Sequence, residues 1–503
     1  MYLPKPPSED QKFSYLDQKK FLFYGWGLLS FVALLSGMVA FSLHSHYVWA
    51  YGIYAAIVAV YLGVSYWIGI FGRSFNHDYH VTRYRSKVLD LIRDRATVDV
   101  YLPSCGEPIE ILENTYKWVR RLDWPEGQLH IYVLDDSGRK EVALLCDKYE
   151  FEYISRPNKG ELKKAGNIRY AFPKTNGNFI LILDADFCPR PDMIHEMIGY
   201  FSDEKTAIVQ TPQYFEVTED QTWIEKGAGY VQELFYRMVQ VNRDTWGASI
   251  CVGTCAMYRR AALAPHGGTY PIAYSEDLHT GWQALVDGWK VRYLPLNLSM
   301  GLCPDSMSGY WIQQTRWCMG STSLLTSKKF WNSKLTFMQR LCYLSGMFYY
   351  IATALSVILT PLPSLIVVWF FPENVFWFNY LFSVPSFLFG VVIVSLWGRH
   401  RFGAYVLSAR QVSYYAHLAA LWEKTKGNII PWVPTGNSGQ VKGSVLYQRI
   451  KVFMFWWVSI VTGLGFAGAF FHMDSLFDYD FYPMLFFTGL HYWVSMRCFS
   501  QEA

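Results

Sequence analysis

The sequence predicts an α/β domain that is inserted between membrane-spanning α-helices. Long apolar runs lie near the N-terminus and in the C-terminal third, and a polar stretch of alternating short strands and helices separates them. Of the 503 residues, 51% are hydrophobic, 18% are aromatic and 17% are charged. A charged fraction below the roughly 25% of an average soluble chain is typical of contact with lipid. The formal net charge of +4 is too small to indicate a nucleic-acid partner, and we expect none.

Six apolar runs are long enough to span a bilayer, which takes about 17–25 residues. In chain order they are Phe21–Leu43, Tyr47–Phe71, Cys342–Phe371, Phe378–Trp397, Val452–Phe471 and Phe481–Met496. Pro361 and Pro363 interrupt the third run, so it forms either one long broken helix or two shorter pieces. We favour one broken helix, which makes about six spans in total.

The basic residues around these runs predict how the helices are oriented. Those that flank the runs on one side are Lys19, Lys20, Arg73, Arg399, Arg401, Lys451 and Arg497. The short connections on the other side, 44–46, 372–377 and 472–480, contain no Lys or Arg. Because loops rich in Lys and Arg remain in the cytosol, we expect both termini and residues 72–341 to be cytosolic. The sequence thus predicts a multi-pass protein of the plasma (cell inner) membrane.

These features divide the chain into three parts. Residues 1–71 hold an N-terminal tail and two spanning helices, residues 72–341 hold the polar domain with interface helices, and residues 342–503 hold the remaining spans. Within the last part, Phe402–Trp422 mixes small, aromatic and polar residues, which is typical of an amphipathic helix at a membrane surface. A Pro- and Gly-rich loop follows within 402–440, and its composition fits either a mobile loop or a plain connector.

Three short apolar segments in the polar domain are predicted strands: Val98–Leu102, His130–Leu134 and Phe179–Leu183. Helical segments connect them, which is the pattern of a parallel sheet built from βαβ units, with ligands at the carboxyl ends of the strands. The polar domain, residues 72–341, has neither a GxGxxG nor a GxxxxGK[ST] motif. A dinucleotide site of the Rossmann type and a P-loop are therefore not supported.

Acidic residues follow two of these strands. Asp135 and Asp136 come after the second strand, and Asp184 and Asp186 come after the third. Two carboxylates with one residue between them suit a hard cation such as Mg²⁺ or Mn²⁺, which would bridge to phosphate oxygens. The alternative is an Asp-rich turn that is exposed to water, which has the same composition.

A second acidic pair, Glu276 and Asp277, stands just before a helical pattern. A carboxylate at the start of a helix acts as a general base when it faces a substrate. Ser275 or Asp277 also suits the N-cap of the helix that follows. The two interpretations are compatible, since a base must be held rigidly.

Two further motifs suit a phosphorylated sugar. Lys164 follows a polar loop and is a candidate partner for phosphate, although an exposed Lys often has no special role. Gln313, Arg316 and Trp317 share one face at helical spacing. They combine an amide, a fork-shaped cation for diphosphate and an aromatic platform for a sugar ring, while a helix at the membrane interface with an ordinary Trp anchor is the alternative.

The order of these motifs resembles the processive family 2 glycosyltransferases, in particular the catalytic subunit of bacterial cellulose synthase. The motifs occur in the order Asp135-Asp136, Asp184-x-Asp186, Glu276-Asp277 and Gln313-x-x-Arg316-Trp317. The resemblance covers the chain from about Val98 to Trp317, and the membrane layout on either side agrees with it. It implies a GT-A fold, a UDP-sugar donor, and Mg²⁺ or Mn²⁺ as cofactor.

The resemblance also implies roles for single residues. Those that would bind the nucleotide sugar are Asp135, Asp136, Lys164, Asp184, Gln313 and Arg316. Asp184 and Asp186 would hold the metal, and Trp317 would bind the acceptor sugar. Asp277, with Glu276 beside it, would take a proton from the acceptor hydroxyl. The implied reaction is a direct displacement that inverts the anomeric centre.

Some features depart from the family pattern. Ser275 stands where the family usually has Thr, and the early segment Ser104–Glu107 lacks the usual aromatic residue and Asn. Trp432 and Thr435 resemble the cellulose synthase gating loop in position, although the Lys that follows in the family is missing. The chain ends at Ala503, soon after the last predicted helix, and we expect no cyclic-di-GMP-binding domain in it.

The sequence therefore predicts a membrane-embedded, processive, inverting glycosyltransferase. It would polymerise a UDP-sugar, with UDP-glucose as the default, into a β-linked polysaccharide such as cellulose or another β-glucan. The growing polysaccharide would be the acceptor, and the product would cross the membrane between the helices. Two alternatives stay open: a non-processive transferase that adds one sugar to a lipid carrier, and a hyaluronan-like synthase that uses an amino-sugar or uronic-acid donor.

Overall fold

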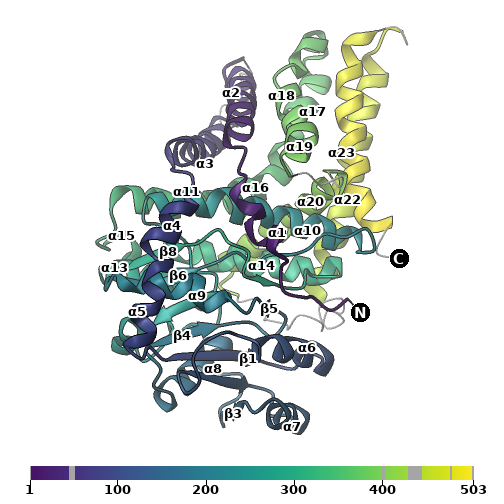
Figure 1. The fold of residues 1–503 in the computed structure, drawn as a ribbon. Coiled ribbons are helices and arrows are strands. Elements are labelled where there is room, and N and C mark those ends of the chain that lie inside the picture. Colours follow the sequence, from purple (N-terminus) through teal and green to yellow (C-terminus); the bar gives the residue numbers. More distant parts are fainter. Residues whose placement is uncertain (1, 45–50, 399–402, 429–443, 476–477, 501–503) are drawn as a thin grey trace.

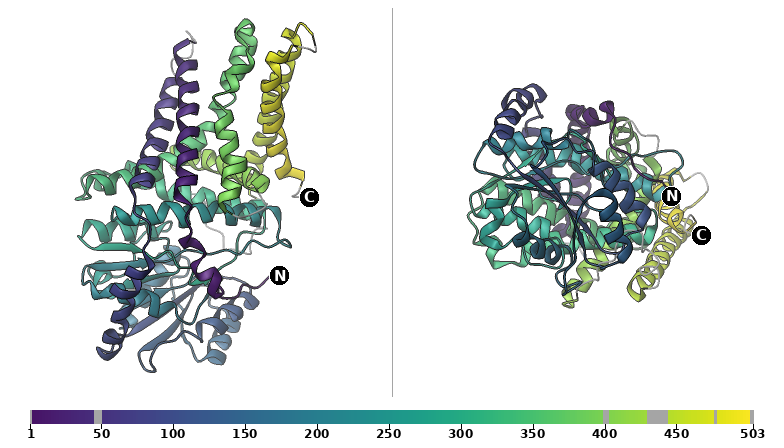
Figure 2. Two further views of the ribbon diagram at one scale, coloured as in Figure 1. Left: turned by 45° about the horizontal axis from the view of Figure 1, so that its top comes forward. Right: turned by 60° about the horizontal axis from the view of Figure 1, so that its bottom comes forward.

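The computed structural model describes residues 2–44, 51–398, 403–428, 444–475 and 478–500. The described chain forms three layers, namely a sheet domain, a middle layer of helices, and long helices that rise on the side opposite the sheet (Figures 1 and 2). The predicted loop residues Trp432 and Thr435 lie outside the described residues.

The central sheet has seven strands in the order β3-β2-β1-β4-β7-β6-β8. Its strands are β1 (Val98–Ser104), β2 (Leu129–Asp135), β3 (Glu152–Ile154), β4 (Phe179–Ile182), β6 (Thr206–Gln210), β7 (Ala256–Arg259) and β8 (Lys290–Tyr293). A second, two-stranded sheet pairs β5 (Cys188–Pro189) with β9 (Ser299–Met300). β1, β2 and β4 confirm the three predicted strands and pair in parallel.

The parallel arrangement of the three predicted strands does not extend to the whole sheet. β7 runs antiparallel to both β4 and β6, so the sheet is mixed. The βαβ pattern of the sequence ends at β4, and the direction of a later strand depends on the route of its connection, which composition does not reveal.

The sheet is buried on both faces, which explains why its strands are almost continuously apolar. In β1, Val100 and Leu102 pack into one core cluster and Tyr101 packs into the other. Leu181 and Ile182 of β4 divide in the same way. The domain helices are α4 (His77–Arg83), α5 (Val88–Arg93), α6 (Ile109–Val119), α7 (Lys140–Tyr149), α8 (Lys163–Ala171), α9 (Met193–Ile198), α12 (Arg260–Leu263) and α13 (Glu276–Val286).

The middle layer lies between the sheet domain and the long helices (Figure 1). It contains α10 (Trp223–Leu234), α11 (Val241–Thr245), α14 (Met307–Ser323), α15 (Lys328–Trp331) and α20 (Gly403–Thr425). α20 is the helix predicted at the membrane surface, and it packs closely against α10 and α14. A Cβ atom on Gly227 of α10 would lie 2.6 Å from the Cβ of Ala409, so small residues allow this approach. The location of α20 against a membrane surface stays a prediction.

Within the described residues, four helical segments are long and apolar enough to cross a membrane: Lys20–Leu43, Tyr51–Phe71, Phe337–Phe370 and Val445–His472. They correspond to α2 (Lys20–His44), α3 (Tyr51–Phe71), α16 (Phe337–Leu359) with α17 (Leu362–Phe370), and α22 (Val445–His472). The third segment breaks between α16 and α17 at Pro361, as expected for one broken helix.

The remaining two predicted spans are weaker. One forms α18 (Val384–Leu388) and α19 (Val394–Gly398) within a shorter apolar helical stretch, and the other forms α23 (Tyr482–Ser500), whose composition is less apolar. The count of six spans therefore stays a prediction.

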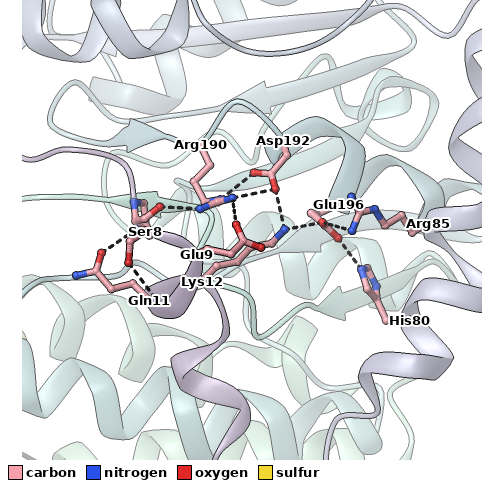
Figure 3. A network of polar contacts seen from close by, with 10 residues as sticks. Ser8, Glu9, Gln11, Lys12, His80, Arg85, Arg190, Asp192 and Glu196 are labelled. Carbon is pink, nitrogen blue, oxygen red and sulfur yellow. Dashed lines mark hydrogen bonds and ion pairs between the residues drawn. The ribbon is translucent and has the colours of Figure 1, made fainter.

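The N-terminal segment before α2 packs along the sheet domain (Figure 3). α1 (Glu9–Phe13) places Lys12 between Asp192 and Glu196, with 2.7 Å from its Nζ to each carboxylate. Glu196 also contacts His80 at 2.9 Å and Arg85 at 3.0 Å. Lys12 and Glu196 are only 2% and 1% exposed, so this ion network is part of the domain interior.

Candidate active site

The predicted site residues lie at one edge of the sheet, where the parallel strands β1, β2 and β4 end. Asp135 is the last residue of β2 and pairs in register with Ser104, the last residue of β1. Asp184 follows β4 by two residues. Its backbone N–H donates to Oγ1 of Thr254, which precedes β7 by two residues, at 2.8 Å. The sheet topology thus brings together residues that are far apart in the sequence.

Asp135 and Asp136 are both buried and hydrogen-bonded to protein groups. Asp135 accepts from the backbone N–H groups of Ser137 and Arg139, each at 2.9 Å, and thereby shapes the turn after β2. Asp136 makes two hydrogen bonds with Arg156, at 2.6 and 2.8 Å. Their contact with a nucleotide stays a prediction, and within the described residues they stabilise the loop at this edge.

Lys164 joins the two sides of the site. Its ammonium group donates to Asp184 Oδ1 and to the carbonyl oxygen of Gly253, the latter at 2.8 Å. Burial opposes the positive charge, but Asp184 and Glu276 outweigh it, so the pKa of Lys164 is raised. Lys164 therefore remains a cation among several carboxylates.

Asp186 carries the strongest sign of crowded negative charge. Burial, followed by the nearby Asp184 and Glu107, raises the pKa of its carboxyl to about 8. Burial likewise raises the pKa of Glu107 above its usual range. Three carboxylates that disfavour one another's charge make a place where a cation is stabilised.

Glu276 and Asp277 begin α13 and face the same cluster. Burial and then the neighbouring Asp277 raise the pKa of Glu276 to about 7, and burial also raises the pKa of Asp277. Of the two predicted N-cap residues, Ser275 makes no capping hydrogen bond with its side chain. Asp277 Oδ1 accepts from the N–H of Leu278 at 2.7 Å, so this carboxylate both belongs to the first turn and is oriented by it.

Two glycines allow the acidic pair to be approached closely. Gly253 has a φ of +78°, and a Cβ there would lie 2.9 Å from the Cβ of Asp277. A Cβ on Gly320 of α14 would lie 1.7 Å from Ser275 Oγ. Neither position leaves room for a larger residue without a shift of the acidic pair.

α14 presents the Gln313–Trp317 motif along the side of the site. Gln313, Arg316 and Trp317 keep some exposed surface, whereas Gln314 and Thr315 between them are buried. Burial lowers the pKa of the Arg316 guanidinium, and Glu276, Asp277 and Asp184 act on it in the opposite direction. The structure thus brings Arg316 near the carboxylates, and its contact with a diphosphate stays a prediction.

The donor set suits a divalent metal only in part. Within the described residues, no group of three or more His, Cys, Asp and Glu side chains converges on one metal position. Asp184 and Asp186 offer carboxylate oxygens, which Mg²⁺ and Mn²⁺ prefer, and Mg²⁺ commonly takes its other ligands from substrate phosphates and water. The crowding that raises the pKa of Asp186 is the observation that fits a cation here.

A cavity of about 1330 Å³ opens from the site into the helical layers. Asp277 and Trp317 line it at the site, Tyr349 lines its middle part, and Phe376 and Asn379 line its other end. Both residues belong to the connection between α17 and α18. This connection lies at the end of the long helices that is far from the sheet (Figure 1). The cavity thus joins the candidate base to the opposite side of the helical layer.

Several site residues were not singled out from the sequence. Gly320 stands beside Ser275 at the start of the acidic pair, and Arg243 and Arg410 line the cavity. The packing of Gly320 is a property of the folded chain. The arginines come from two helices of the middle layer, and nothing in their local sequence indicates that they line one cavity.

A mixed α/β sheet with carboxylates at its strand ends, beside a helix with an amide, an Arg and a Trp, is compatible with the fold of a glycosyltransferase. Residues 99–267 match the family model "Glycosyl transferase family 2". The chain therefore contains a domain that matches family 2 glycosyltransferases.

Curated relatives agree with this assignment. The chain is 33% identical over 259 residues to the UDP-forming cellulose synthase catalytic subunit of Xanthomonas axonopodis. The aligned residues cover 50% of this chain and 35% of that protein. The chain is also 33% identical over 287 residues to the cellulose synthase 1 catalytic subunit of Komagataeibacter xylinus, covering 56% and 38%. The aligned part thus spans little more than a third of these relatives.

A solved structure supports the fold. The mannosyltransferase PcManGT from Pyrobaculum calidifontis, in complex with GDP-Man and Mn²⁺, superimposes with a TM-score of 0.50. The match covers 74% of this chain and 99% of that chain, at 16% sequence identity. At this identity the likeness confirms the GT-A-like fold alone.

Proposed function

We propose that the protein is a membrane-embedded, processive glycosyltransferase that polymerises a UDP-sugar into a β-linked polysaccharide and passes the product through its own helices. The cavity that runs from Asp277 to Phe376 and Asn379 is the observation that carries the proposal. A transferase that adds one sugar to a lipid needs no such passage. The curated relatives, which are named as UDP-forming, favour UDP as the leaving group and glucose as the first donor to test.

The transfer step follows from the geometry of the acidic pair. The Asp277 carboxylate takes the proton of an acceptor hydroxyl, whose oxygen attacks the anomeric carbon of the donor sugar. The bond from that carbon to the diphosphate breaks on the opposite side, so an α-linked donor gives a β-linked product. Lys164 and Arg316 bind the negative diphosphate, and Trp317 stacks on the acceptor sugar at the mouth of the cavity.

The raised pKa values suit this role. A general base works best when its pKa is near the working pH, and burial raises the pKa of both Asp277 and Glu276. Glu276 lies beside the base and shares its electrostatic surroundings. Asp184 and Asp186 would hold Mg²⁺ or Mn²⁺, which supplies positive charge to the departing diphosphate when bound.

The cavity solves a physical problem of export. A polysaccharide cannot cross lipid unaided, because each unpaired hydroxyl is costly to remove from water. Aromatic rings and hydroxyl groups such as those of Tyr61 and Tyr349 line the passage and suit sugar faces and sugar hydroxyls. The proposal places the sheet domain in the cytosol and the spanning helices in the inner membrane.

Synthesis by the purified full-length protein in proteoliposomes tests the proposal. With UDP-glucose and Mg²⁺ or Mn²⁺ on the outside, we expect a long β-glucan that a linkage-specific glucanase degrades only after the vesicles are opened. Chelation of the metal with EDTA should stop synthesis. If every UDP-sugar gave only a single sugar on a lipid, the enzyme would be the non-processive transferase instead.

A further inference from the structure

The cavity contains two arginines without an acidic partner. Arg243 of α11 and Arg410 of α20 both line it, and they are the only Lys or Arg side chains in its described lining. Arg243 is only 4% exposed. Among the described residues, neither guanidinium takes part in an ion pair or hydrogen bond.

The carboxylates nearest in sequence or space are already engaged. Asp244, beside Arg243, contacts Arg292 at 3.2 Å and accepts the backbone N–H of Tyr293 at 2.8 Å. Glu233, on α10, pairs with Arg237 at 2.7 Å. Asp277 is the single carboxylate in the described lining, and the proposed reaction uses it as the base.

The two guanidinium groups serve the same stretch of the passage. Both act electrostatically on the hydroxyl of Tyr61, which α3 contributes to the lining. A Cβ on Gly346 of α16 would lie 3.0 Å from a terminal nitrogen of Arg243, so this glycine leaves room for the guanidinium. The charges are thus accommodated by packing but are not neutralised.

Burying a cation without a counter-charge is costly, even after local relaxation. Arg stays protonated and presents a planar fork of donors that matches a carboxylate. A neutral glucan would hydrogen-bond to the forks but would leave both charges uncompensated. A chain that carries carboxylates would neutralise them as it passes.

We propose that the cavity passes an acidic polysaccharide, with Arg243 and Arg410 binding carboxylates of its sugar units. This inference rests on the proposed function and narrows its substrate class. Because synthesis and passage are coupled in one chain, the carboxylate must enter with the donor. A UDP-linked uronic acid is then a substrate, in place of UDP-glucose or alternating with it.

Binding of two matched oligosaccharides tests the inference without catalysis. The full-length protein in phosphatidylcholine nanodiscs is titrated with cellohexaose and with its C6-oxidised form, a β-1,4-linked oligomer of glucuronate. We expect the oxidised oligomer to bind about tenfold more tightly at low salt, and this ratio to fall as salt is added. Equal affinities would overturn the inference.

Variants assign the preference to the two side chains. Arg243→Gln and Arg410→Gln should each lower the affinity for the oxidised oligomer and leave that for cellohexaose within about twofold, which also shows that the variant is folded. Arg93→Gln, an exposed change on α5, is the control and should alter neither value. A preference that survives in both cavity variants would overturn the inference.

Two further outcomes are informative. If the arginines bind an anionic lipid instead, phosphatidylglycerol nanodiscs should abolish the preference for the oxidised oligomer, which would overturn the inference. With UDP-glucose and UDP-glucuronate together, the product should bind an anion-exchange resin. A neutral polymer with equal oligomer affinities would contradict the inference alone, whereas no polymer from any donor would contradict the proposed function.

Discussion

Two groups of carboxylates in the same domain occupy opposite electrostatic surroundings. In the N-terminal ion network (Lys12, His80, Arg85, Asp192 and Glu196; Figure 3), every carboxylate has cations within hydrogen-bond distance. Burial alone would raise the pKa of Glu196, but its hydrogen bonds with His80 and Lys12 lower it. Charge balance is therefore complete without a ligand.

The carboxylates at the strand ends have far less compensation. Asp184, Asp186, Glu276 and Asp277 share one nearby lysine, Lys164, with the Arg316 guanidinium close by. Burial and mutual repulsion raise the pKa of Asp186 and Glu276 rather than lowering it. Uncompensated carboxylates of this kind are typical of a functional site, where a bound ligand supplies the missing positive charge. The contrast therefore distinguishes the strand-end carboxylates, which bind a ligand, from the ion network, which stabilises the fold.

The largest effect should come from the base itself. Asp277→Asn keeps the shape of the side chain but cannot take a proton, so we expect turnover to fall about a thousandfold. Initial rates of sugar incorporation measure it. Asp94→Asn, an exposed change at the end of α5, is the control and should keep full activity. A comparable rate in Asp277→Asn would remove Asp277 from the role of base.

Much of this site was predictable from the sequence, because its residues follow short apolar strands and keep a fixed order. The pairing of Lys164 with Asp184, in contrast, needs α8 to pack beside β4, and no local pattern encodes that contact. The nucleotide contact of Asp135 and Asp136 stays a prediction; the structure shows Asp135 bonded to the turn that follows it and Asp136 bonded to Arg156.

The fold shows the same division. Strand β1 and the break at Pro361 were predicted, because side-chain periodicity and the proline ring act locally. The antiparallel direction of β7 and the placement of Arg243 and Arg410 in one cavity depend on the route of the whole chain. Local sequence patterns therefore predict single strands and helix breaks. Which charged side chains lie close together depends on tertiary packing.

The second effect concerns stability and should appear in the ion network. Glu196→Gln removes a buried negative charge that Lys12 and Arg85 require, so the free energy of unfolding should fall by about 3 kcal/mol. Because the pKa of Glu196 is lowered, its stabilisation is present above its ordinary pKa of 4.5 and is lost as the pH falls further. Thermal unfolding of the full-length protein in detergent measures the loss.

The matched control for Glu196→Gln is Glu126→Gln, an exposed change in a turn, which should leave the midpoint unchanged. Turnover per folded molecule should remain near that of the unmodified protein. A loss of turnover at full stability would show that the network serves the site and would erase the contrast between the two groups.

The third effect tests how the acidic pair is held. Gly320→Ala would place a methyl group 1.7 Å from the present position of Ser275 Oγ and push the start of α13. We expect turnover to fall about tenfold, since small misplacements of a base are costly. Ser275→Gly in the same protein removes the clash and should restore most of the rate. Gly463→Ala, with no atom within 4 Å of its new Cβ, is the control.

The smallest expected effect separates the two groups of carboxylates most clearly. Removing a carboxylate charge should destabilise the protein in the ion network but stabilise it in the strand-end cluster. Asp186→Asn relieves repulsion from Asp184 and Glu107, so in EDTA the variant should be more stable than the unmodified protein by about 1 kcal/mol. In excess Mn²⁺ the order should reverse, since only the unmodified site gains the binding energy of the metal. Thermal unfolding under both conditions gives the two values. If the variant were less stable than the unmodified protein in EDTA, Asp186 would stabilise the fold, as Glu196 does, and would not be a cation ligand.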